Sequence, residues 1–349
     1  IAKSDNPIMS ARNPARPLPG ANSLRLFDAD ALTEAVRSSR LEHSQIEQGN
    51  FQAELKRVDL GRLSVDSGCY TRKVIAGGDF PPDCVIVGCV LDSREEGCVN
   101  GFRFRRHDLI IFPEGAELDC VLPGATTWCT VQLSGILLEE AGCAETVFDR
   151  IKVLPGNRPV NAQLVRLLDC LVHSRMPDTA ADGNWQCTPS LPDEETLLDQ
   201  IRRLLVDYSS ECISVRRPSL RNRLSLVRRF EHKVRERIDT VIRIPELCTE
   251  LGASQRTVEN LVRDEIGMTP KQFCKILRLN AIRRELLRNR TAHETIASIA
   301  GRNGINHMGR FAADYQRQFG EHPSETIKKG TFDGAVRHNR QRVCPPAPL

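Results

Sequence analysis

The last third of the chain contains two copies of one local pattern, at residues 247–263 and 299–316, with a long amphipathic segment between them. Each copy has a short apolar helix pattern, a sharp turn and a second helix pattern whose remaining positions are polar and basic. This order is typical of a helix-turn-helix unit. The repeat therefore restricts this part of the chain to a small all-helical domain with two such units.

Residue types at the expected helix ends support this prediction. Gly252 is suited to the positive φ of a tight turn, and Ser254 is a good N-cap for the helix that follows. Gly301 and Gly304 surround the turn of the second copy. Between the copies, Thr269-Pro270 starts a helix that we predict to end near Arg288. Its length is roughly 29 Å, close to the ~34 Å between successive major-groove windows on one face of B-DNA.

Charge is unevenly divided along the chain. Between Arg221 and Gly330 there are 22 Lys/Arg against 13 Asp/Glu, a net +9, whereas the whole chain carries +4, which leaves about −5 for the remainder. A basic carboxyl-terminal domain beside an acidic amino-terminal one indicates that the former meets a polyanion. A solvated helical surface would be the alternative explanation of the same imbalance.

The polar face of each second helix is the expected DNA-contact surface. In the first unit it lies opposite the apolar stripe of Val258, Leu261 and Val262. An arginine can bind guanine with two hydrogen bonds, and Asn or Gln can bind adenine. We predict base contacts from Gln255, Arg256 and Asn260 and a phosphate contact from Arg263. The full set of predicted DNA-contact residues is Ser254, Gln255, Arg256, Glu259, Asn260, Arg263, Asn306 (also the expected N-cap of the second unit), His307, Met308, Arg310, Gln316 and Arg317.

The amino-terminal half has a different periodicity. Short runs with period-two alternation are separated by Gly, Pro and Asp, as in a β-barrel or sandwich. We predict strands at 53–58, 70–75, 84–90, 109–112 and 126–133, with turns that include 77–79, 81–83 and 113–115.

Two helices with leucine stripes, Gln163–His173 and Glu194–Tyr208, are expected after the strands. They either pack on the barrel or meet the same helices of a second subunit, and we favour a homodimer. Arg216 to Ser219 is the expected hinge. The predicted fold class is α+β, divided into a disordered arm (1–25), a cupin-like barrel with dimerisation helices (26–215), a tandem helix-turn-helix domain (216–330) and a tail (331–349).

Five motifs in the carboxyl-terminal third carry a family resemblance, at residues 254–258, 267–270, 278–286, 311–315 and 319–324. Through them this third resembles the AraC/XylS family of bacterial transcription regulators, and within it the ethanolamine-utilisation regulators. The segment His107 to Gly115 resembles a strand and turn of the sensor barrels found in this family. The resemblance implies sequence-specific binding to promoter DNA, activation with RNA polymerase as a partner, and a small-molecule effector in the barrel.

Other function classes are disfavoured. No run approaches ~18 apolar residues, so no membrane span is expected. The 13 cysteines are scattered without a C-x-x-C pair, which indicates reduced thiols in the cytoplasm. Because His-x-His is missing, His107 is expected to be structural, and we predict no metal, no cofactor and no enzyme activity. Two alternatives stay open: a dimeric DNA-binding regulator that senses no ligand, and a cupin-type metalloenzyme.

Overall fold

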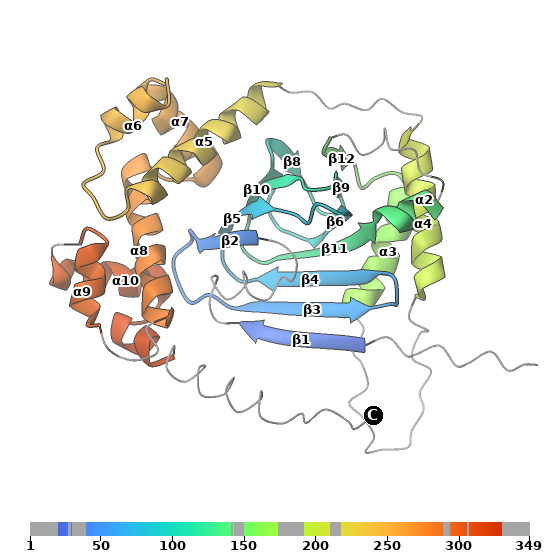
Figure 1. Ribbon diagram of the computed structural model, residues 1–349, viewed down its shortest axis with the longest axis horizontal. Coiled ribbons are helices and arrows are strands. Elements are labelled where there is room, and N and C mark those ends of the chain that lie inside the picture. The colour runs from blue at the N-terminus through green and yellow to red at the C-terminus, as the bar shows by residue number, and fades with distance from the viewer. Residues whose placement is uncertain are drawn as a thin grey trace, which may run out of the picture.

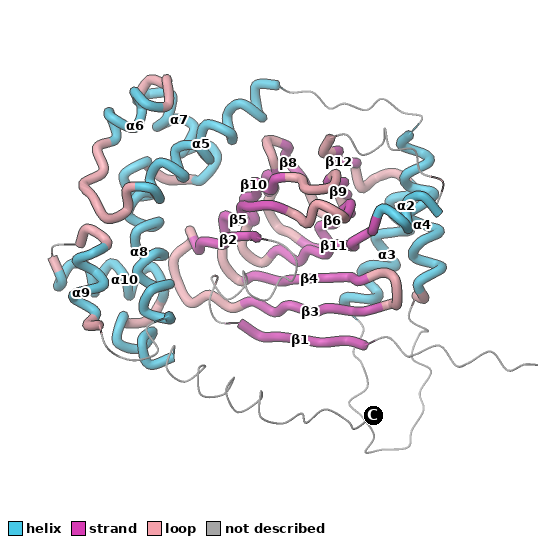
Figure 2. Tube along the Cα trace, viewed as in Figure 1, coloured by secondary structure: helices cyan, strands magenta, loops and turns pink. Residues whose placement is uncertain are grey.

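Strands and helices are segregated along the chain in the computed structural model. A sheet domain comes first and a helical domain follows, side by side in space (Figures 1 and 2). This confirms the predicted α+β class. The structure describes residues 20–26, 29, 40–140, 142, 150–173, 192–209, 218–288, 294–305 and 307–329.

The sheet domain contains two antiparallel sheets. The seven-stranded sheet has the order β1-β3-β4-β11-β6-β9-β12, and the five-stranded sheet has the order β2-β5-β10-β7-β8. In sequence order the strands are β1 (Gly20–Leu26), β2 (Arg40–Gln45), β3 (Ala53–Asp59), β4 (Ser64–Tyr70), β5 (Val74–Asp79), β6 (Cys84–Asp92), β7 (Gly97–Val99), β8 (Phe102–Phe104), β9 (Leu109–Phe112), β10 (Glu117–Leu122), β11 (Thr126–Ser134) and β12 (Lys152–Leu154).

The larger sheet is buried on both faces, and β6 shows how. Ile86 and Val90 point into the core between the two sheets, while Val87 and Cys89 point to a second core beneath the helices. A strand with two buried faces reads as a continuous apolar run rather than as an alternation, which is what residues 84–91 show. Helices α2 (Gly135–Glu140), α3 (Pro159–His173) and α4 (Glu194–Ser209) lie over that second core (Figure 1).

The leucine stripes of α3 and α4 are buried inside this subunit. Leu164, Leu168 and Leu171 of α3 pack with Leu197 and Leu204 of α4 against the strands. Of the two roles expected for the stripes, the structure therefore shows packing on the sheet. A second subunit would have to meet the remaining faces of these helices.

The helical domain follows the predicted order closely. Its helices are α5 (Pro218–Glu236), α6 (Ile244–Glu250), α7 (Gln255–Ile266), α8 (Pro270–Arg288), α9 (Ile296–Arg302) and α10 (Met308–Phe319), and a further helical segment covers residues 323–329. Separate apolar cores lie around α5 to α8 and around α8 to α10. Each helix-turn-helix unit is thus supported by its own core.

Three local predictions in the sheet domain are wrong. Residues 70–75 are not one strand, because β4 ends at Tyr70 and β5 begins at Val74. The expected turn at Gly77 to Asp79 is instead the second half of β5. Among the described strands, β1, β2, β4, β7, β8, β10 and β12 were not predicted. The expected arm, 1–25, overlaps β1, which pairs with β3. The rest of the arm, the hinge residues 216–217 and the tail lie outside the described residues. The other two expected hinge residues, Pro218 and Ser219, are instead the first two residues of helix α5.

His43 is a buried histidine in the core between the sheets. Burial lowers its pKa to about 4, and its Nδ1 has no hydrogen-bond partner among the described residues. In the unfolded chain the imidazole of His43 takes up a proton near the ordinary pKa of 6.5. The free energy of unfolding therefore has its full value above pH 6.5 and decreases as the pH drops toward 4. This decrease amounts to about 3 kcal/mol, and we expect it to be absent in His43→Leu. The measurement is the free energy of unfolding of both proteins at several pH values. Val90→Ala, which removes apolar contacts from the same core but no titratable group, is the control and should keep the wild-type pH profile.

Candidate nucleic-acid interface

The first helix-turn-helix unit consists of α6 and α7. Gly252 at the turn has φ +64°, and the Oγ of Ser254 accepts a hydrogen bond from the backbone N–H of Thr257 at 3.1 Å. Gly267 ends α7 in the left-handed conformation, with φ +92°. The predicted N-cap at Ser254 and the predicted turn at Gly252 are therefore confirmed.

The second unit consists of α9 and α10. Thr295 caps α9 through its side chain, and Gly304 at the turn has φ +74°. His307 occupies the N-cap position of α10 without a side-chain hydrogen bond to the helix. Asn306, which we expected to cap this helix and contact DNA, lies outside the described residues.

The predicted contact residues of the first unit lie on the exposed side of α7, which is opposite its buried stripe. Gln255 Nε2 donates a hydrogen bond to Glu259 Oε1 at 2.8 Å. Within the described residues, the side chains of Arg256, Asn260 and Arg263 have no hydrogen-bond or ion-pair partner. Their donors are available to a ligand without breaking any internal contact.

The exposed side of α10 is organised around one carboxylate. Asp314 lies 3.0 Å from Arg317, 3.9 Å from Arg310 and 2.5 Å from Lys275 of α8, each distance joining a carboxylate oxygen to a side-chain nitrogen. The predicted residues His307, Met308, Arg310, Gln316 and Arg317 are all exposed. Asp314 and Lys275 were missed in the sequence, although Asp314 follows Arg310 by four positions and precedes Arg317 by three, the spacing of ion pairs along a helix.

Helix α8 joins the two units and is fixed to each by an arginine. Arg278 Nε and Nη2 donate to the carbonyls of Ile238 and Thr240, at 3.1 and 2.8 Å, just before the first unit. Arg283 donates to Glu321 Oε1 at 2.6 Å and lies over the ring of Phe319 in the second unit. The 19 residues of α8 give it a length of roughly 29 Å, and its predicted bounds are confirmed.

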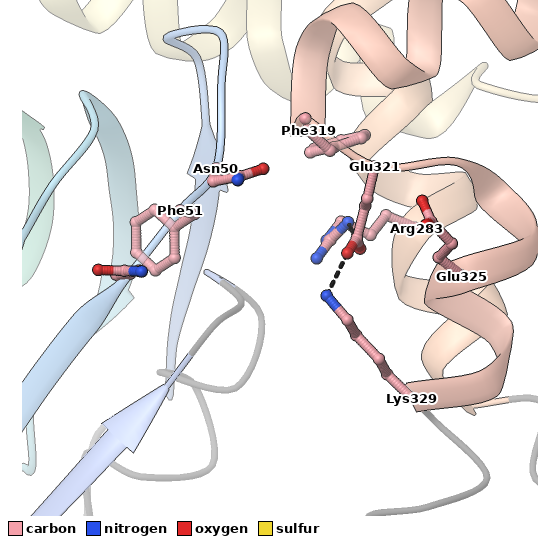
Figure 3. A pocket seen from close by; sticks show the side chains of 9 residues that line it. Asn50, Phe51, Arg283, Phe319, Glu321, Glu325 and Lys329 are labelled. Atoms are coloured by element: carbon pink, nitrogen blue, oxygen red, sulfur yellow. Dashed lines mark hydrogen bonds and ion pairs between the residues drawn. The ribbon is translucent and has the colours of Figure 1, made fainter.

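A cleft of about 230 Å³ separates the second unit from the sheet domain. Figure 3 shows Asn50 and Phe51 on one side and Phe319, Arg283 and Glu321 on the other. We expected the ligand pocket at the barrel mouth, whereas the space between the sheets holds the packed side chains of the core. Among the described residues no group of three His, Cys, Asp or Glu is arranged to hold a metal, and no described helix is long and apolar enough to cross a membrane.

Comparison with known proteins agrees with this geometry. Residues 247–329 match a family model described as a helix-turn-helix domain. The probable thc operon regulatory protein of Rhodococcus erythropolis is 35% identical over 89 residues, which are 26% of this chain and 27% of that protein. The XylDLEGF operon transcriptional activator of Pseudomonas putida is 32% identical over 96 residues, 28% of this chain and 30% of that protein. The chain thus spans less than a third of the length of these relatives.

A solved structure matches a similar fraction of the chain. The probable AraC family transcriptional regulator from Rhodopseudomonas palustris CGA009 is 30% identical and covers 30% of this chain and 97% of its own, with a TM-score of 0.28. The two curated relatives are thus named as an operon regulatory protein and an operon transcriptional activator. Residues 247–329 are therefore a helix-turn-helix domain that is similar to the matched parts of the probable thc operon regulatory protein and the XylDLEGF operon transcriptional activator.

Proposed function

We propose that the whole chain is a sequence-specific transcription regulator that binds double-stranded promoter DNA through both helix-turn-helix units. The observation that supports this most is the exposed polar face of α7, where Arg256, Asn260 and Arg263 have no partner among the described residues. Base edges and phosphates are the groups that such donors bind. The protein would work in the bacterial cytoplasm, where the promoter DNA is.

Selection of DNA by the full chain tests this proposal. We expect the purified protein to enrich a subset of genomic fragments and to protect two neighbouring half-sites on one face of the duplex. The affinity should fall steeply with salt, because each neutralised phosphate contributes a slope of about −0.9 to log K against log salt. Equal retention of all fragments, or no retention at low salt, would contradict sequence-specific binding.

The mode of regulation is a further part of the proposal. The Pseudomonas putida relative is named an activator, which supports activation and RNA polymerase as a partner. A homodimer would double the number of DNA-contact units and raise avidity. Because the leucine stripes are buried, we place its interface on the outer faces of α3 and α4. The ethanolamine-utilisation branch stays a prediction.

Two forms of the proposal differ in the role of the sheet domain. In the first form, a small effector binds the sheet domain and controls DNA binding. In the second form the sheet domain senses no ligand, which the side chains packed between the sheets favour. Calorimetry of the full chain against small amines and aromatic acids separates the two. Saturable heat that His43→Leu removes would place an effector between the sheets.

A further inference from the structure

The edge strand β2 of the five-stranded sheet lies against α8 of the helical domain (Figure 1). The backbone N–H of Gln45 donates to Asn280 Oδ1 at 3.1 Å, and Asn280 Nδ2 donates back to the Gln45 carbonyl at 3.0 Å. Asn280 is 1% exposed. The middle of α8 thus supplies the hydrogen bonds that a neighbouring strand would otherwise supply to this residue.

The same end of β2 also contacts the second helix-turn-helix unit. Gln45 Nε2 donates to the carbonyl of Gln318 in α10, and Gln318 Nε2 donates to the carbonyl of Gln45, both at 3.1 Å. The backbone N–H of Gly49 donates to that same Gln318 carbonyl at 3.0 Å. Gln45 and Gln318 are buried, so these bonds are shielded from water.

Neighbouring strands hold the first unit. Arg235 of α5 donates to Ser44 of β2 at 2.9 Å, and Arg103 of β8 pairs with Glu265 near the end of α7 at 2.7 Å. Arg228 of α5 lies 2.7 Å from Asp119 of β10. One sheet therefore contacts both units, on surfaces that leave the predicted DNA-contact residues exposed.

Gly77 of β5 makes the Arg228 contact possible. The guanidinium of Arg228 occupies the space where a side chain of residue 77 would begin, so an added Cβ would overlap it. Residue 77 has no positive φ, and alanine fits its backbone. Gly77→Ala would thus displace Arg228 from Asp119 without removing a charge. Gly88 of β6 is a matched control site, because a Cβ there would meet its nearest atom at an ordinary 3.5 Å.

We propose that the sheet domain fixes the angle between the two helix-turn-helix units, and that Asn280 is the positioning residue through which it sets the half-site spacing the protein accepts. This inference rests on the proposed DNA binding. Helix α8 by itself fixes a distance, and its side chains Lys275, Arg278 and Arg283 each bind one unit. Contacts from one rigid sheet to α5, α7, α8 and α10 prevent the units from rotating about α8 independently.

A spacing series tests the proposal with the full chain. Affinity is measured on the selected operator and on versions with one or two base pairs inserted or removed between the half-sites, and on a single half-site. We expect the wild type and Gly88→Ala to lose about tenfold or more with altered spacing, whereas Asn280→Leu and Gly77→Ala lose less than about threefold. Binding to the single half-site should be the same for all four proteins. Destabilisation alone would lower every affinity equally and would leave this spacing profile unchanged.

The possible outcomes distinguish a failure of this inference from a failure of the proposed function. A wild type that binds no duplex contradicts the proposed function. A wild type that binds its operator but tolerates every spacing overturns the inference alone. So does Gly77→Ala with the spacing profile of the wild type, and this variant decides the question if Asn280→Leu fails to fold by circular dichroism.

Discussion

Arg283→Ala is expected to unfold the second helix-turn-helix unit while the first unit stays folded. The Arg283 side chain is 6% exposed and pairs with Glu321, which is 11% exposed, at 2.6 Å. It also donates to Thr326, whose hydroxyl is bonded to Tyr315. Removal of one partner of a buried pair leaves the other buried and only partly compensated, here by Lys329. The expected cost is about 3 to 5 kcal/mol, which is comparable with the stability of a small unit.

The measurements are urea unfolding followed by circular dichroism, and footprinting on the selected operator. We expect an early unfolding transition and a footprint that shrinks to one half-site. Arg288→Ala, at an exposed position on the same helix, is the control and should behave as the wild type. A full two-site footprint with Arg283→Ala would show that the buried pair does not maintain the second unit.

Arg256→Ala and Arg263→Ala are expected to weaken DNA binding in different ways. Both side chains are exposed on α7 without a partner among the described residues. Loss of a two-bond contact to guanine costs about 1 to 3 kcal/mol, or about 5- to 150-fold in affinity. Arg256→Ala should therefore also lose preference at one base position. Arg263→Ala should weaken all sequences alike and reduce the salt slope by about 0.9.

Competition assays with each base varied in turn, repeated at several salt concentrations, measure both effects. Asp264→Ala is a suitable comparison, because its carboxylate pairs with Arg223 rather than facing outward unpaired. Sequence-independent losses of the same size from both arginine variants would contradict the roles that we assign to Arg256 and Arg263.

The helical domain could be predicted from the sequence because its determinants are local. Pro270 and the run of apolar residues indicated the bounds of α8, and Ser254 indicated the start of α7. Helix caps depend on residues within one turn, so a single sequence contains the needed information. The exposed faces of α7 and α10 follow from the same periodicity, which is why the described contact residues all lie at exposed or half-exposed positions.

The sheet domain was less predictable because its determinants are distant in sequence. Gly77 looks like a turn residue, yet it lies in β5, where Arg228 from α5 packs over it. Residues 71–73 contain no Gly or Pro, so the turn between β4 and β5 gave no local sign. A leucine stripe indicates that one face of a helix is buried, but it does not indicate what covers that face. For α3 and α4 both the sheet and a second subunit were therefore possible partners.

The positioning contacts were invisible for the same reason. Asn280 sits in a helix at a position where the sequence offers no partner, since Gln45 lies 235 residues away. Asp314 was within reach of pattern analysis, but its third cation, Lys275, comes from another helix. Side chains that connect elements are thus found only once the elements are placed.

The position of β2 has a consequence for the integrity of the molecule. An edge strand of a sheet, whose N–H and C=O groups are free on one side, is a template on which other chains can add a strand. Such strand addition leads to aggregation. Here the side chains of Asn280 and Gln318 form hydrogen bonds with the backbone N–H and C=O groups of Gln45. Proteolytic removal of the carboxyl-terminal third would uncover the N–H and C=O groups of Gln45, and we expect other chains to add strands at this edge of the remaining half.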